Sequence, residues 1–366
     1  MGFELPPYPY DLLEPYREIA AKHTGGIVDL SVGTPCDPPP NLVIDALANS
    51  DSERGYPPSI GSQNFRDSCQ HWVKRRFNVD LDIEKNIGAC IGTKEFVVST
   101  PSYLRLRSPD KDTVLYPEVS YPSYAMGAHL AGCRAVPVKI NENGELSLEE
   151  LDSSDIERTL MLWVNSPNNP TGALVDLDLI AEWGRNNQIP VFSDECYAEF
   201  TWDRPPQTIL NKSLQGVVAV HSLSKRSNLA GIRAGFYAGD EGLVHWLKEI
   251  RKHSGKMIPG PVQAAASMAY SDDEHVEEQQ LRYRERLVFL QSCLHSLEVD
   301  SNFPQGSFYL WVASDSNGPW DLVERLADEV GVLVAPGTFF GSSGHVRVAA
   351  VQTLETLSLI SDRIGS

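Results

Sequence analysis

The sequence predicts an α/β fold in which a large domain with a mostly parallel sheet is followed by a smaller α+β domain. Short apolar runs recur between residues 87 and 222, each bounded by turn residues, with helical patterns between them. Strands that are apolar throughout are typical of a parallel sheet covered on both faces. After residue 260 the pattern changes to one long amphipathic helix and then two strands around a shorter helix. That change predicts a separate α+β unit.

The first 40 residues are rich in proline and aromatic residues. Because proline at this density disfavours helix, we expect an extended arm that lies over another part of the molecule or over a second subunit. Weak alternation at residues 27–32 predicts a short strand within this segment. Further on, residues 65–77 place Phe65 and Trp72 on one helical stripe, which predicts an amphipathic helix.

The remaining elements follow from the same patterns. The long amphipathic helix is expected at residues 276–297 and the shorter one at 320–331, between strands at 307–312 and 345–351. The apolar runs that predict buried strands of the large sheet are residues 87–92, 113–117, 134–138, 159–164, 189–193 and 216–222. We expect three parts: residues 1–35, an arm and part of the small domain; residues 36–260, the large domain; and residues 261–366, the small domain.

Composition excludes several classes of protein. With 31 Lys and Arg against 49 Asp and Glu, the 366-residue chain has a formal charge of −18. A nucleic-acid partner is therefore not expected, because phosphate affinity comes from Lys and Arg. No apolar stretch reaches the roughly 18 residues of a membrane span, and the N-terminus lacks the pattern of a signal peptide. None of the six cysteines forms a CxxC pair, so we expect free thiols, no metal site and a cytoplasmic protein with no membrane partner.

A lysine near the middle of the chain is a candidate nucleophile. Lys225 follows the apolar run at 216–222, with Ser222 before it and Arg233 eight residues after it. A desolvated amine near other cations has the lowered pKa that a Schiff-base lysine needs, and hydroxyls with an arginine can bind phosphate. An exposed loop lysine is the alternative. The residue alone does not decide between the two.

Polar residues also follow two other apolar runs. Asn169 lies in the turn SPNNPTG, and Asp194 begins the sequence DECY that contains Tyr197. In open α/β sheets, ligands gather at the carboxyl ends of the strands. A carboxylate at that edge needs a cation, a metal or a protonated ring nitrogen as its partner. The sequence shows no cluster of His and Cys ligands around it, which disfavours a metal.

Three further positions are compatible with ligand binding. Thr93 and Lys94, in IGTKEFV, are placed to offer backbone N–H groups at a helix start. Tyr121 could stack on a ring, although a core or interface tyrosine is the alternative. Arg347 lies in an apolar strand, where a buried charge needs a partner such as a substrate carboxylate.

Taken together, NNPTG, SDECY and SLSK with its following arginine resemble the fold type I, pyridoxal-phosphate-dependent class I/II aminotransferases. The resemblance covers essentially the whole chain. It implies the aspartate aminotransferase-like fold with a seven-stranded large sheet, and pyridoxal 5'-phosphate as cofactor. Lys225 matches the lysine that forms the internal aldimine and moves the proton, and Asp194 matches the partner of the pyridinium nitrogen. Asn169 and Tyr197 match the groups that bind the ring's 3-oxygen, and Tyr121 matches the stacking aromatic.

The same resemblance implies the rest of the site. Tyr56 matches a tyrosine donated to the neighbouring subunit's phosphate, which implies a homodimer with shared active sites. Arg347 matches the arginine that binds the substrate α-carboxylate, with Gly33 and Asn169 beside it. Lys225, Asp194 and Tyr197 are the expected catalytic residues. The positions that match the phosphate-binding groups are Thr93, Lys94, Ser222, Ser224 and Arg233.

Within the family, stretches such as SLSKRSNLAG and DECYAEFTWD are similar to the actinobacterial type of N-succinyldiaminopimelate aminotransferase. That resemblance implies ping-pong amino transfer between glutamate/2-oxoglutarate and succinylated diaminopimelate (N-succinyl-2-amino-6-oxopimelate as acceptor), in lysine biosynthesis. Alternatives are a C–S β-lyase and an aminotransferase for LL-diaminopimelate or aromatic amino acids. We do not expect a transcription regulator of this fold, because it would need an N-terminal DNA-binding module and the cofactor domain is expected to begin by about residue 30. Candidates for the distal carboxylate, by position only, are Arg54, Arg105 and Lys256.

Overall fold

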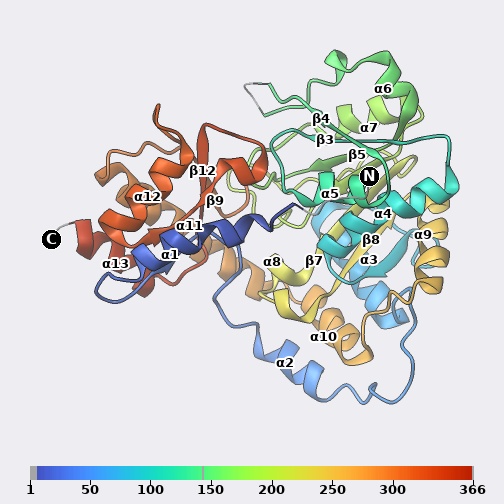
Figure 1. Cartoon of the computed structure of the whole chain (residues 1–366). Helices are drawn as coiled ribbons and strands as arrows, with labels where there is room; N and C mark the ends of the chain where they lie inside the picture. Colours follow the sequence, from blue (N-terminus) through green and yellow to red (C-terminus); the bar gives the residue numbers. More distant parts are fainter. Residues whose placement is uncertain (1–5, 142–143, 365–366) are drawn as a thin grey trace.

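The computed structural model describes residues 6–141 and 144–364. Figure 1 shows two units side by side. The larger unit contains the strands of the middle of the chain, and the smaller unit contains the C-terminal helices together with the N-terminal helix α1 (Glu14–Ala20). Helix α1 and the C-terminal helices, which lie far apart in sequence, therefore share one unit.

Seven strands form one sheet in the larger unit. Their order is β2-β8-β7-β6-β5-β3-β4, and β8 runs opposite to the other six strands. This confirms the predicted fold class. The strands are β2 (Ile87–Cys90), β3 (Thr113–Pro117), β4 (Arg134–Val138), β5 (Thr159–Asn165), β6 (Val191–Asp194), β7 (Val217–Ser222) and β8 (Gly235–Gly239).

Helices cover both faces of this sheet. On one face α3 (Gln63–Phe77), α7 (Leu177–Asn186) and α10 (Gly260–Ser271) enclose one apolar core. On the other face the core is formed with α4, α5 and α9. Burial on both faces is why the inner strands are largely apolar rather than alternating, whereas the edge strand β4 is mostly exposed or half-buried. The other helices of this unit are α2 (Asn41–Ala48), α4 (Thr93–Arg107), α5 (Ser123–Leu130), α6 (Ser153–Arg158), α8 (Leu223–Arg226), α9 (Glu241–His253) and the 3₁₀ turns η2 (Leu148–Glu150) and η3 (Ala230–Ile232).

The smaller unit has its own apolar core, which includes Leu13 and Val28 from the N-terminal segment. Two short strands pair in parallel, and three others form an antiparallel sheet in the order β11-β12-β9. The elements are β1 (Val28–Asp29), β9 (Tyr309–Ala313), β10 (Val332–Leu333), β11 (Ala335–Pro336), β12 (His345–Ala349), α11 (Glu274–Ser296), α12 (Pro319–Val330), α13 (Leu354–Ile364), η1 (Pro9–Leu13) and η4 (Gly337–Phe340).

The N-terminal segment is less extended than expected. It forms η1 and α1, and its prolines do not prevent them, because Pro9 and Pro15 stand in the first turn of their helices. At that position the missing N–H has no intrahelical partner to lose. The expectation of a wholly non-helical arm was wrong for this reason.

The three-part division of the chain remains a prediction. α10 (Gly260–Ser271) begins one residue before the expected start of the small domain, and it packs against α2 and α3 of the larger unit. The chain passes to the smaller unit at α11. Among the described residues no helix is long and apolar enough to cross a membrane.

Candidate active site

The candidate site is a cavity of about 350 Å³ at the carboxyl ends of β5, β6 and β7, bordered by residues of the smaller unit. The register places Asn165, the last residue of β5, opposite Asp194, the last residue of β6. The predicted site residues that line the cavity are Gly33, Thr93, Lys94, Tyr121, Asn169, Asp194, Tyr197, Ser224, Lys225, Arg233 and Arg347. Residues that are remote in sequence therefore meet at the edge of the sheet at which a ligand was expected from the sequence.

Lys225 lies in α8, directly after β7, and its amine donates to the backbone carbonyl of Gly33. Burial lowers the pKa of this amine to about 8, and the positive charges of Arg347 and Arg233 act in the same direction. A substantial fraction of the amine is therefore neutral near physiological pH. A neutral amine is the form that attacks a carbonyl carbon or accepts a proton.

Asp194 is a buried carboxylate with its oxygens already oriented. Oδ1 accepts from the backbone N–H of Cys196 at 3.2 Å, and Oδ2 accepts from the hydroxyl of Tyr124 at 3.1 Å. Burial raises the pKa of Asp194, against these hydrogen bonds and the charge of Lys225. An additional cationic partner would stabilise the ionised form in such a site.

A chain of hydrogen bonds connects the turn after β5 to this strand edge. Asn165 donates from Nδ2 to the carbonyl of Asp194 at 2.7 Å, and its Oδ1 accepts from the backbone N–H of Asn169 at 2.7 Å. The side chain of Asn169 thereby faces the cavity, where its Oδ1 accepts from Arg347 at 2.8 Å. Nearby, the hydroxyls of Tyr197 and Tyr309 are hydrogen-bonded at 2.8 Å.

The N-terminus of α4 offers an anion site. The residue before it, Gly92, has φ 74° and no side chain caps the helix. A Cβ at Gly92 would lie 2.6 Å from Nη2 of Arg233, so glycine allows the guanidinium to approach the helix start. Uncapped N–H groups of Thr93 and Lys94 beside an arginine suit a phosphate.

Arg347 lies on β12 and is 1% exposed. Its guanidinium donates to the carbonyl of Ser31 at 2.6 Å and lies 4.4 Å from the ring of Tyr309 and 4.5 Å from that of Phe340. Among the described residues no carboxylate forms an ion pair with it. A buried, unneutralised guanidinium that faces a cavity is a site for an anion.

The mouth of the cavity is aromatic. Lys94 donates from Nζ to the hydroxyl of Tyr121 at 3.3 Å, and the same nitrogen lies 5.5 Å from the ring of Tyr121 and 5.6 Å from that of Tyr8. Burial, with a smaller effect of Tyr10, raises the pKa of Tyr121 to about 12. The flat face of a neutral phenol is thus available for stacking.

Two predicted residues do not line the cavity. The hydroxyl of Ser222 caps α8 instead, accepting from the N–H of Ser224 at 3.1 Å and donating to its hydroxyl at 2.9 Å. Tyr56 is 98% exposed and does not approach the cavity of its own chain. The distal candidates lie elsewhere as well: Arg105 donates to the carbonyl of Lys111, Lys256 lies 3.8 Å from Glu95, and Arg54 is exposed.

Sequence reasoning missed three tyrosines at the site, Tyr10, Tyr124 and Tyr309. Tyr10 accepts from Arg347 at 3.2 Å. Tyr309 explains why position 33 is glycine, because a Cβ on Gly33 would lie 1.9 Å from the Tyr309 hydroxyl. No spacing in the sequence distinguishes these tyrosines from core residues, although Tyr124 is three residues beyond the predicted Tyr121.

The pattern that defines aminotransferase class I and II matches residues 25–364. The chain belongs to the class I and II aminotransferases. It is 39% identical over 371 residues to 4-dedimethylamino-4-oxo-anhydrotetracycline transaminase of Streptomyces rimosus, with 99% of each chain covered. It is 31% identical over 376 residues to LL-diaminopimelate aminotransferase of Aquifex aeolicus, covering 98% of this chain and 96% of that one. The structure of a probable N-succinyldiaminopimelate aminotransferase from Thermus thermophilus matches with a TM-score of 0.86 and 28% identity, covering 98% of this chain and 99% of that one.

Class I and II aminotransferases depend on pyridoxal phosphate, and the cavity fits that cofactor. A pyridine nitrogen needs a buried acid, an aldehyde needs a reactive amine, and a phosphate needs N–H donors with positive charge. Asp194, Lys225 and the α4 N-terminus beside Arg233 provide these groups around one cavity. The chain is thus a pyridoxal-phosphate-dependent aminotransferase.

Proposed function

We propose that this aminotransferase moves an amino group between glutamate and N-succinyl-2-amino-6-oxopimelate, in the formation of diaminopimelate and lysine. The observation that carries the proposal is a pair of cations at one cavity, neither of which has a carboxylate partner among the residues described. Arg347 lies inside the cavity, and Lys94 lies exposed at its mouth. Both proposed substrates carry a carboxylate at each end, so two separated cations match their charge.

The residues of the cavity take complementary roles in this proposal. Bound pyridoxal phosphate supplies a ring that withdraws electrons from the substrate's α-carbon. Asp194 would hold a proton on the ring nitrogen, and Asn169 and Tyr197 would donate to the ring oxygen. The N–H groups of Thr93 and Lys94, with Ser224 and Arg233, would hold the phosphate, and Tyr121 would stack on the ring.

The proton transfer is assigned to Lys225. Its amine is neutral in part at physiological pH because burial lowers the pKa to about 8. It therefore can take the proton from the substrate's α-carbon as a general base and deliver it again within the same cavity. Arg347 orients the substrate by its α-carboxylate, with Gly33 beside it, and so presents the α-carbon to the amine.

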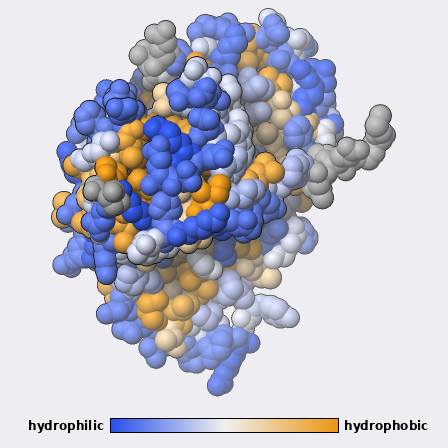
Figure 2. All heavy atoms as spheres, turned by 60° about the vertical axis from the view of Figure 1, so that its left-hand side comes forward, coloured by the Kyte–Doolittle hydropathy of each residue, from blue (hydrophilic) through white to orange (hydrophobic). Residues whose placement is uncertain are grey.

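A homodimer with shared sites is part of the proposal. Tyr56 is 98% exposed, and Leu42, Ile44 and Met268 expose apolar side chains on α2 and α10. Figure 2 shows apolar side chains gathered at the lower end of its view, the end at which α2 and α10 lie in Figure 1. An exposed apolar group of this kind suits a subunit contact, and Tyr56 would then reach the partner's phosphate.

LL-diaminopimelate is the second candidate substrate. Several relatives at 30–31% identity are named LL-diaminopimelate aminotransferases, and that molecule also carries a carboxylate at each end. Arg347 and Lys94 would bind its two carboxylates in the same way. The charges of the cavity therefore favour an acidic substrate but do not distinguish LL-diaminopimelate from the succinylated substrate.

The test of the proposed function is the absorbance of the purified holoenzyme. Glutamate alone should convert the visible band of the bound cofactor to the shorter-wavelength band of its amino form. N-succinyl-2-amino-6-oxopimelate should then restore the visible band. An unchanged spectrum with glutamate would exclude glutamate as the amino donor, and C–S β-lyase activity would then be the function to test. Restoration by 2-oxoglutarate but not by the succinylated acceptor would overturn the acceptor, and conversion by LL-diaminopimelate would favour the second candidate.

Lys94→Gln tests the distal cation. We expect the KM for glutamate to rise about tenfold, the equivalent of roughly 1.4 kcal/mol. The KM for alanine, which lacks a distal carboxylate, should stay unchanged, because the backbone N–H at residue 94 remains. Lys74→Gln is the matched control, since Lys74 forms its ion pair with Asp80 at 2.8 Å and lies outside the cavity. Equal changes for glutamate and alanine would contradict the assignment.

A further inference from the structure

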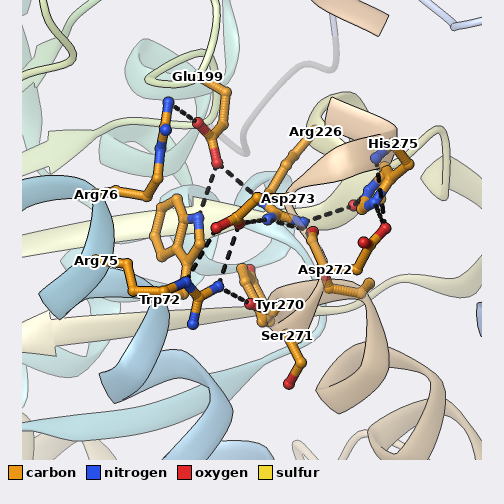
Figure 3. A network of polar contacts seen from close by, with 12 residues as sticks. Trp72, Arg75, Arg76, Glu199, Arg226, Tyr270, Ser271, Asp272, Asp273 and His275 are labelled. Carbon is orange, nitrogen blue, oxygen red and sulfur yellow. Dashed lines mark hydrogen bonds and ion pairs between the residues drawn. The ribbon is translucent and has the colours of Figure 1, made fainter. Parts of the chain in front are cut away.

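Arg226, the residue directly after Lys225, lies at the centre of a buried polar network (Figure 3). Its side chain is 3% exposed. A guanidinium has five N–H donors, and the structure supplies five acceptors. Two are Glu199 Oε1 and Asp273 Oδ1, each at 3.0 Å, and one is the carbonyl of Asp272, also at 3.0 Å. The other two are the Ser227 hydroxyl at 3.2 Å and the carbonyl of Ala269.

Glu199 connects this network to the segment that follows β6, the strand that ends at Asp194. It lies five residues after Asp194, and its Oε1 accepts from Trp72 Nε1 at 2.8 Å as well as from Arg226. Its Oε2 lies 2.8 Å from Nη2 of Arg76 (Figure 3). The segment after β6 and the turn after β7 are thus bonded to each other and to α3.

The network also reaches the point where the chain passes from the larger to the smaller unit. Asp272 and Asp273 join α10 to α11, and both bond to Arg226. His275, in the first turn of α11, bonds to the Ser227 hydroxyl at 2.8 Å. The short turn that carries Lys225 is therefore held by the junction between the units, through Arg226 and Ser227.

We infer that Arg226 is a positioning residue, which fixes the turn of Lys225 so that the amine points into the cavity. α8 has only four residues, and a helix that short has no stability of its own. Neighbouring helical residues point about 100° apart, so Arg226 enters the network while Lys225 lines the cavity. The bonds of Arg226 then determine the direction of the amine. This inference depends on the aminotransferase assignment and not on the identity of the acceptor.

Arg226→Lys in the holoenzyme tests the inference, because lysine keeps the charge but loses the five-donor fork. We expect cofactor to bind and the KM for glutamate to stay near that of the wild type. The rate of the glutamate half-reaction should fall about 10- to 100-fold, as expected for a misplaced general base. The midpoint of the pH titration of the cofactor's visible band should shift by about one unit, because the environment of the amine changes.

Arg75→Lys is the matched control. Arg75 bonds to Asp273 and to the carbonyl of Tyr270 in the same network but does not contact α8. It should lower the melting temperature without changing the half-reaction rate or the titration midpoint. If Arg226→Lys also lowers only the melting temperature, the residue is merely structural and the inference is overturned. Should Arg226→Lys fail to fold, Glu199→Gln must reproduce the slower half-reaction and the shifted midpoint, and wild-type values for it would overturn the inference.

Discussion

Replacing Lys225 with alanine is expected to lower turnover by about four orders of magnitude, because in the proposed mechanism one change would remove both the amine that holds the cofactor and the general base. Cofactor should still bind, since Asp194 and the groups around the α4 N-terminus do not depend on that amine. Steady-state assays with glutamate measure the loss, and dialysis followed by absorbance measures retained cofactor. Wild-type-like turnover in this variant would exclude Lys225 from the chemistry.

The pH dependence of cofactor loading provides a second readout of the same lysine. Burial lowers its pKa from 10.5 to about 8. Below that pH the amine is protonated and unreactive, so the loading rate of the cofactor-free enzyme should rise through pH 8 and level off above it. An amine with an ordinary pKa would still be gaining rate at pH 10. Stopped-flow absorbance of wild type distinguishes these profiles.

The Lys225 variant also tests whether sites are shared between subunits. In a hybrid dimer of Lys225→Ala and Tyr56→Phe subunits, sharing would leave one site with both an intact Lys225 and an intact Tyr56. The activity of the hybrid should then exceed that of either parent homodimer. If Tyr56 acted in its own subunit, every site would carry a defect and no activity would be regained. A monomer in light scattering would contradict the dimer outright.

Much of the fold could be predicted from the sequence, because strands buried on both faces must be apolar throughout. Six of the seven large-sheet strands gave apolar runs, including the edge strand β4, which is mostly exposed or half-buried. β8 (Gly235–Gly239) did not, since its glycines are dictated by close backbone approach: a Cβ on Gly235 would lie 2.3 Å from the carbonyl of His221. The N-terminal helices were missed because the effect of a proline depends on its helix position, which composition does not show.

Site residues that lie in short sequence motifs could be proposed from the sequence. Residues that reach the site only through tertiary packing could not. Lys225, Asp194 and Asn169 each end or follow a strand, so topology brings them together. Tyr124 reaches Asp194 from a helix 70 residues away, and no local pattern reveals that contact. Arg226 is adjacent to the predicted lysine, but its importance becomes visible only when its five acceptors are in place. The motif roles themselves remain predictions until the variants are measured.

Arg347→Lys is expected to lower kcat/KM for glutamate about 100-fold, the equivalent of roughly 2.7 kcal/mol, because the bidentate pairing of a guanidinium with a carboxylate is lost. Lysine keeps the positive charge but cannot present two parallel N–H groups to a carboxylate. The loss should be confined to substrates with an α-carboxylate. An amine that lacks this group should react at the same slow rate with variant and wild type, which separates lost recognition from a damaged site.

Arg286→Lys is the matched control for that prediction, since both arginines are buried and border the smaller unit's core. Arg286 donates to both oxygens of Asp37 at 2.7 Å, so its charge is already neutralised within the chain. Arg347 has no such carboxylate among the described residues. The control should therefore lose thermal stability and keep its kcat/KM, whereas Arg347→Lys should lose kcat/KM. Equal losses of kcat/KM in the two variants would mean that the unpaired charge of Arg347 serves packing and not the substrate.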